Sequence, residues 1–188
     1  MQEPRFLDRT TPPKIITLIL LAGLSALTMN IFLPSLPGMA AYFGVPYGLM
    51  QQSVALYLAL SAALQVVIGP ISDRFGRRKV LLWSLSLFLI ATLGTLVAPN
   101  ATVFLIFRMA QAVIASGMVL SRAIVRDMVA DAQAASMIGY VTMGMSLVPM
   151  IGPVIGGFLD DLYGWQANFA VLLILGAAVL ALVWSDLG

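Results

Sequence analysis

A single arginine, Arg108, stands about seven residues inside a long apolar stretch of the chain. A charged side chain at the bilayer centre costs about 2.5–3.5 kcal/mol on insertion scales, so such residues usually face a partner or a hydrated cavity. Gln111 follows one helical turn later on the same face, and Arg122 continues that face. We therefore predict that Arg108 occupies a hydrated interior site. The alternative is that its long side chain reaches the nearer membrane surface, roughly 10 Å away.

The sequence of 188 residues contains neither cysteine nor histidine. This removes thiolate and imidazole metal ligands, disulfides and every Ser–His or Cys–His catalytic pair. We therefore expect no enzyme activity, no metal site and no cofactor. The net charge of +2 resides in short segments between apolar runs, which favours a role in membrane topology over nucleic-acid binding.

The elements that must position Arg108 are long apolar helices. Hydrophobic residues make up 61% of the chain and charged residues 10%, whereas soluble domains carry about 25% charged residues. A bilayer core needs roughly 20 apolar residues per helix. Six such stretches occur, at 14–36, 48–70, 79–97, 101–125, 134–158 and 166–185. The sequence predicts an all-α membrane protein, with an N-terminal segment 1–13 followed by a six-helix transmembrane bundle over 14–188.

Basic residues are confined to alternate connections between these stretches. They are Arg5, Arg9 and Lys14 before the first, Arg74, Arg77, Arg78 and Lys79 between the second and third, and Arg122 and Arg126 at the end of the fourth. The segments 37–47, 98–102 and 159–165 carry none. By the positive-inside rule, we expect segment 1–13 and both termini to be cytoplasmic.

The second connection carries the most specific motif. It runs Gly69-Pro-Ile-Ser-Asp73-Arg74-Phe-Gly76-Arg77-Arg78-Lys79 and resembles the signature loop of the major facilitator superfamily. Gly69 is expected to allow close helix approach, and Gly76 a reversal at positive φ. Asp73 is expected to neutralise a neighbouring guanidinium or cap a helix. An ordinary cationic loop is the alternative interpretation.

Three further segments fit the same family. Arg108-Met-Ala-Gln111-Ala resembles its Arg-x-x-Gln-Gly motif, and the first apolar stretch, with Asn30-Ile-Phe-Leu-Pro-Ser-Leu-Pro, resembles exporters of the bicyclomycin-resistance (Bcr/CflA) group. The fifth stretch is similar to the Gly-Pro-x-x-Gly-Gly motif of antiporters, and its motif residues are Pro149, Gly152, Pro153, Gly156 and Gly157. We expect Gly152 and Gly156 to form a close-packing helix face, and the two prolines to bend the helix.

The resemblance implies the N-terminal half of a major facilitator fold, built as an inverted 3+3 repeat. The tetrapeptides Ile68-Gly-Pro-Ile and Ile151-Gly-Pro-Val, at corresponding places in the two three-helix halves, fit such a repeat. The resemblance to the family also implies a bacterial inner-membrane transporter that exports drug-like or small metabolite substrates by alternating access, with protons as the usual coupling ion.

Polar or adaptable side chains within the stretches are candidates for the substrate cavity and for coupling. They are Asn30, Tyr57, Gln65, Arg108, Gln111, Arg122, Tyr140 and Met143. Asn30 stands where relatives often carry an acidic residue, and an amide cannot carry a proton near neutral pH. Depth arithmetic places Asn30 level with Arg108, so we expect the Asn30 carbonyl oxygen to accept a hydrogen bond from Arg108, directly or through water.

The chain supplies one six-helix bundle where the resemblance implies two. A fragment, a truncated gene product and a half-transporter that pairs as a homodimer all remain open. In a homodimer, Gly69 and Asp73 are expected to face Gly152 and Gly156 of the second copy. The expected partners are the lipid bilayer, a small-molecule substrate and either a second copy or a missing second half. The alternative function is a non-transporting membrane subunit that binds lipid or a partner chain.

Overall fold

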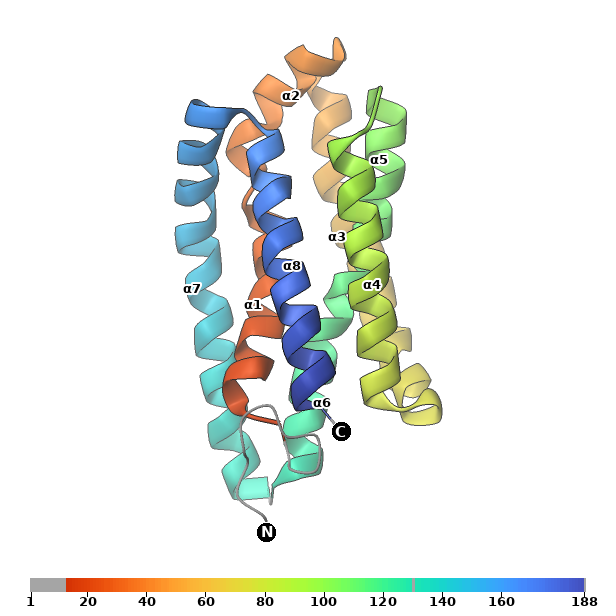
Figure 1. Ribbon diagram of the computed structural model, residues 1–188, viewed down its shortest axis with the longest axis vertical. Coiled ribbons are helices and arrows are strands. Elements are labelled where there is room, and N and C mark those ends of the chain that lie inside the picture. The colour runs from red at the N-terminus through yellow and green to blue at the C-terminus, as the bar shows by residue number, and fades with distance from the viewer. Residues whose placement is uncertain (1–12, 130, 188) are drawn as a thin grey trace.

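The computed structural model describes residues 13–129 and 131–187, which form helices joined by short connections (Figure 1). The α-helices are α1 (Ile15–Asn30), α2 (Leu36–Phe43), α3 (Tyr47–Phe75), α4 (Arg77–Leu96), α5 (Ala101–Ala110), α6 (Ser116–Met128), α7 (Asp131–Tyr163) and α8 (Gln166–Asp186). Two 3-10 turns, η1 (Leu33–Ser35) and η2 (Gln111–Ala115), connect α1 to α2 and α5 to α6.

These helices form six spans that are long and apolar enough to cross a membrane. They are Ile15–Phe43, Tyr47–Phe75, Arg77–Leu96, Ala101–Met128, Gln133–Tyr163 and Gln166–Asp186. The first span comprises α1, η1 and α2, and the fourth comprises α5, η2 and α6. The expected all-α bundle of six transmembrane helices is confirmed.

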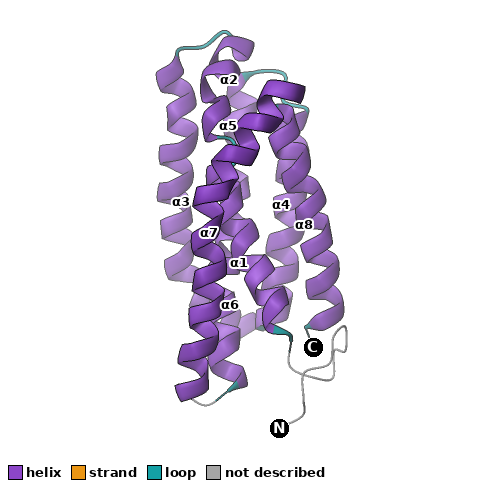
Figure 2. Cartoon of the chain, turned by 90° about the vertical axis from the view of Figure 1, so that its left-hand side faces the viewer, coloured by secondary structure: helices purple, strands orange, loops and turns teal. Residues whose placement is uncertain are grey.

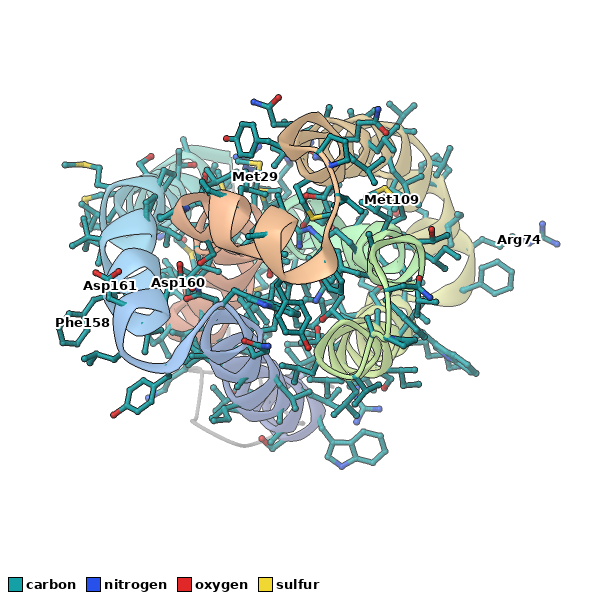
Figure 3. All side chains as sticks on the ribbon, turned by 90° about the horizontal axis from the view of Figure 1, so that it is seen from above. Met29, Arg74, Met109, Phe158, Asp160 and Asp161 are labelled. Atoms are coloured by element: carbon teal, nitrogen blue, oxygen red, sulfur yellow. The ribbon has the colours of Figure 1, made fainter. Side chains whose placement is uncertain are left out.

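The two described ends of the chain lie at the same end of the bundle (Figures 1 and 2). The α3–α4 turn with Arg77 and Arg78 and the C-terminal end of α6 with Arg126 also lie there. We call this the basic end. The opposite end carries α2, the α4–α5 connection, and Asp160 and Asp161 near the end of α7 (Figure 3).

The packing of the spans follows the expected inverted repeat. In an inverted repeat, the first, second and third spans correspond to the fourth, fifth and sixth. The contact of the first span with the fifth therefore corresponds to the contact of the fourth with the second, and both contacts occur. Likewise, the contact of the first span with the sixth corresponds to the contact of the fourth with the third, and both contacts occur. The third and sixth spans, α4 and α8, pack on each other. This symmetry in a six-helix unit is the plan of many transporters.

The burial of the spans is uneven. Within the most apolar part of each span, 61% of the first is buried, but only 17% of α3 and 11% of the fifth span. Large apolar side chains are exposed along both helices, such as Val66 on α3 and Met150 and Val154 on α7. Both α3 and α7 therefore present an apolar face that the other described helices leave uncovered.

Candidate functional site

Arg108 on α5 is fully buried inside the bundle. Its Nη1 donates to Gln111 Oε1 at 2.9 Å, and its Nη2 donates to the backbone carbonyl oxygen of Thr28, also at 2.9 Å. Its Nε is buried without a hydrogen-bond partner among the described residues. The side chain therefore turns into the protein, and the expected interior site is confirmed over the alternative of a side chain that reaches the membrane surface.

Two aromatic rings enclose the guanidinium. Its central carbon lies 4.2 Å from the ring centroid of Phe32 and 3.9 Å from that of Tyr57, which is itself buried. Among the described side chains, no carboxylate forms an ion pair with Arg108. Ring faces and carbonyl oxygens therefore stabilise the charge, and cation–π contacts are worth about 2 kcal/mol or more when desolvated.

The end of α1 makes the Thr28 carbonyl available. Pro34 has no N–H, and in a continued α-helix its ring would clash with the carbonyl of Asn30, four residues earlier, so the α-helix ends at Asn30. The last carbonyl groups of a helix lack partners within it. Leu27 O accepts from Ile31 N, and Thr28 O accepts from Arg108. The proline break in the first span thus supplies an acceptor for the buried cation.

A polar chain continues from Gln111 to the third span. Gln111 Nε2 donates to Thr92 Oγ1 at 2.8 Å, and Thr92 Oγ1 donates to Phe88 O at 2.7 Å within α4. Gln111 and Thr92 are fully buried. This chain fixes the amide so that its oxygen faces Arg108.

The expected direct bond between Asn30 and Arg108 is wrong. Asn30 Nδ2 donates to Ala26 O at 2.9 Å, and its side chain lies beside Gly152 of α7. The depth estimate ignored rotation about the helix axis, since Thr28 and Asn30 are about 200° apart at 3.6 residues per turn. Phe32 follows Thr28 by four residues and so shares its face. That spacing was the sequence signal for Thr28 and Phe32, which were missed.

The structure brings together only some of the other predicted cavity residues. Tyr57 joins Arg108 and Gln111. Gln65 on α3 and Arg122 on α6 are half-buried. Tyr140 and Met143 are 53% and 60% exposed on the uncovered face of α7. Their roles in a substrate cavity remain a prediction.

In the signature loop, Gly76 has a φ of 91°, which confirms the expected reversal at positive φ. Asp73 forms an ion pair with Arg77 at 3.1 Å, as expected, and Arg77 also pairs with Asp127 at the end of α6, which was not predicted. Arg74 points away from the bundle (Figure 3).

The close helix approach expected at Gly69 does not occur among the described residues of this chain. A Cβ at Gly69 would meet no described atom within 4 Å, so no described helix packs closely on it.

The glycines of α7 pack against α1 of the same chain. A Cβ at Gly152 would lie 3.2 Å from Leu27, and one at Gly156 would clash with the backbone carbonyl of Ile31. The expected close-packing face is confirmed, but the expected contact of Gly152 and Gly156 with Gly69 and Asp73 of a second copy is wrong, because α1 already covers that face.

The other residues of the α7 motif lie within this long helix. Pro149 and Pro153 are inside α7, which runs as one α-helix from Asp131 to Tyr163. A Cβ at Gly157 would contact Pro34 of the first span. The motif therefore keeps α7 closely packed on α1 near the site of Asn30.

The family model described as "Major Facilitator Superfamily" matches residues 18–186. The chain belongs to the Major Facilitator Superfamily. This family of membrane transporters, not enzymes, is the one that the motifs indicated, and the six-helix bundle is half of its fold.

The chain is similar to several drug-resistance proteins of this superfamily. It is 32% identical to "Multidrug resistance protein D" of Escherichia coli over 88% of this chain and 42% of that protein. It is 36% identical to "Chloramphenicol resistance protein" of Pseudomonas aeruginosa over 86% of this chain and 39% of that protein. It is 30% identical to "Multidrug resistance protein MdtM" of Salmonella typhimurium over 87% and 40%. The chain spans about two-fifths of the length of these relatives.

Proposed function

We propose that this bundle is one half of a secondary transporter that exports drug-like or small apolar metabolite molecules by alternating access, in a bacterial inner membrane with both termini cytoplasmic. The observation that carries the proposal is the buried Arg108, held by the first and fourth spans and covered by Tyr57 of the second. A buried charge inside a membrane bundle is expensive and usually marks a transport site. The drug-resistance names of the relatives support this substrate class.

A second six-helix unit completes the proposed transporter. The uncovered apolar faces of α3 and α7 are the surfaces that such a unit would contact, since their apolar windows are only 17% and 11% buried. The homodimer of identical halves gains no support from the relatives, more than half of whose length lies outside the match. Cysteines at Ala62 and Leu147, both exposed near the middle of α3 and α7, test it. A homodimer would cross-link between chains through this pair; a second unit of different sequence would not.

We also propose that transport is coupled to protons, although Asn30 itself cannot carry one. Asn30 is a neutral amide bonded to its own helix, and Arg108 has no carboxylate partner among the described residues. A carboxyl at position 30 would lie beside Gly152, close to the Pro34 break.

Flux measurements test the transport proposal. The particle purified in mild detergent is reconstituted into liposomes, and chloramphenicol flux is measured with and without a pH gradient. We expect flux above that of empty liposomes, and Asn30→Asp is expected to increase its dependence on the gradient. Lack of flux in a particle that retains a second six-helix unit would contradict transport and favour a non-transporting subunit.

A further inference from the structure

Two adjacent hollows meet at the basic end beside α3 and α4. One is an apolar groove of about 570 Å³ along α4, whose lining includes Phe75, Lys79, Trp83 and Ile90. The other is a hollow of about 540 Å³ at the α3–α4 turn, lined by Arg77, Arg78 and Lys79 among others. Phe75 and Lys79 line both. The two hollows are therefore adjacent and share part of their wall, and together they offer an apolar part and a cationic part.

The side chains of the apolar part are exposed on the outer surface of the bundle, where they would face the bilayer. Trp83 is 78% exposed, and Phe75 and Ile90 are 58% and 61% exposed. From Lys79 to Ile90 the groove follows about 16 Å of helix, at 1.5 Å per residue. One leaflet of the hydrocarbon core is about 15 Å thick. The groove thus extends from the membrane surface to about the midplane.

The cationic part retains positive charge that no carboxylate among the described side chains neutralises. Arg77 is paired with Asp73 and Asp127. Arg78 donates to the backbone carbonyl of Trp184 at 3.2 Å, and its Nε is buried without a hydrogen-bond partner in the described part of the chain. Neither Arg78 nor Lys79 forms an ion pair with a described carboxylate. Arg78 also lies over the ring of Trp184, 5.2 Å from its centroid, and the terminal nitrogens of Arg78 and Lys79 are the groups that would donate hydrogen bonds to a negatively charged oxygen at this place.

We propose that this site binds one anionic phospholipid, with an acyl chain in the groove along α4 and the headgroup phosphate at Arg78 and Lys79. A basic pocket next to membrane-spanning helices is a recognised kind of headgroup site. The shape favours a lipid over a free anion, because the cationic hollow adjoins an apolar groove whose length matches one leaflet. The site is separate from Arg108 and faces the lipid rather than the bundle interior.

Fluorescence of Trp83 tests the site directly. A variant in which Trp165 and Trp184 are replaced by phenylalanine leaves Trp83 as the only tryptophan. This variant is placed in two kinds of phosphatidylcholine vesicles. One contains a small fraction of phosphatidylglycerol with brominated chains, and the other contains the same fraction of phosphatidylcholine with brominated chains. We expect the brominated phosphatidylglycerol to quench Trp83 severalfold more effectively at equal mole fraction. Lys79→Gln should reduce this preference by about fivefold, the effect of one cation near the surface.

Three further variants and one competitor complete the test. Arg78→Gln should also lower the preference, whereas Arg126→Gln, an exposed cation at the same end, should leave it unchanged. Ser86→Phe, which narrows the groove without changing charge, should reduce quenching by the anionic lipid. Equal quenching by the two lipids, or a preference that Lys79→Gln leaves intact, would overturn the proposal. Loss of the preference in millimolar inorganic phosphate would also overturn it, because the site would then be an anion site without lipid selectivity.

Discussion

Replacing Arg108 by lysine keeps the charge but removes the planar fork that reaches two acceptors. Arg108 donates one hydrogen bond to Thr28 O and one to Gln111 Oε1. A hydrogen bond to a charged group contributes about 1.5–3 kcal/mol, and a lysine nitrogen on its single stem replaces at most one of the two. The other acceptor would remain buried without a donor. We expect a total loss of about 2–4 kcal/mol in the free energy of unfolding.

The assay is thermal unfolding in detergent micelles, in a background in which Trp83 and Trp184 are replaced by phenylalanine, so that the fluorescence reports the buried Trp165. The expected loss corresponds to a decrease of roughly 5–10 °C in the midpoint. Gln111→Leu and the double variant complete a double-mutant cycle, and residues that share a hydrogen bond should couple by about 0.5–3 kcal/mol. Arg126→Lys, on the exposed end of α6, is the matched control and should change the midpoint little. A stable Arg108→Lys variant with additive effects would refute the proposed geometry.

Other substitutions probe the packing and the signature loop. Gly156→Ala would clash with the backbone carbonyl of Ile31 at the end of α1, and it should lower the free energy of unfolding by about 1–3 kcal/mol. The control Gly139→Ala, with nothing within 4 Å, should be neutral or stabilising. Equal thermal midpoints of the two variants in the same detergent would contradict the α1–α7 contact. Gly76→Ala should cost about 1–2 kcal/mol because φ is 91° there; an unchanged midpoint would show that the turn has another conformation. Asp127→Asn removes one partner of an exposed ion pair with Arg77, so it should change stability by at most about 1 kcal/mol, and less at high salt; a large, salt-independent loss would contradict a surface pair.

The sequence predicts those features that depend on length and local chemistry. Runs of apolar residues indicate the six spans, and the glycine at position 76 indicates a backbone reversal that the structure confirms. The insertion cost of Arg108 predicts an interior partner, and Gln111 is one because it lies one turn away on the same helix.

Contacts between helices depend on rotation about each axis, which depth alone does not give. Asn30 was assigned to Arg108 by depth, but Thr28 and Phe32 occupy the face that meets the guanidinium. The acceptor at Thr28 is a backbone carbonyl, so the side chain at position 28 does not reveal it, and only the four-residue spacing to Phe32 indicates the shared face. In the same way, the glycines of α7 indicate a close-packing face but do not identify the helix that packs on it. In the structure that helix is α1 of the same chain.

We propose that the buried guanidinium of Arg108 belongs to a transport pathway for small apolar molecules. The most direct measurement is the initial rate of chloramphenicol flux in liposomes that contain equal amounts of folded wild-type or Arg108→Gln particle. We expect flux well above that of empty liposomes for the wild type, and a rate near that of empty liposomes for the variant. Equal rates in the two particles would contradict it.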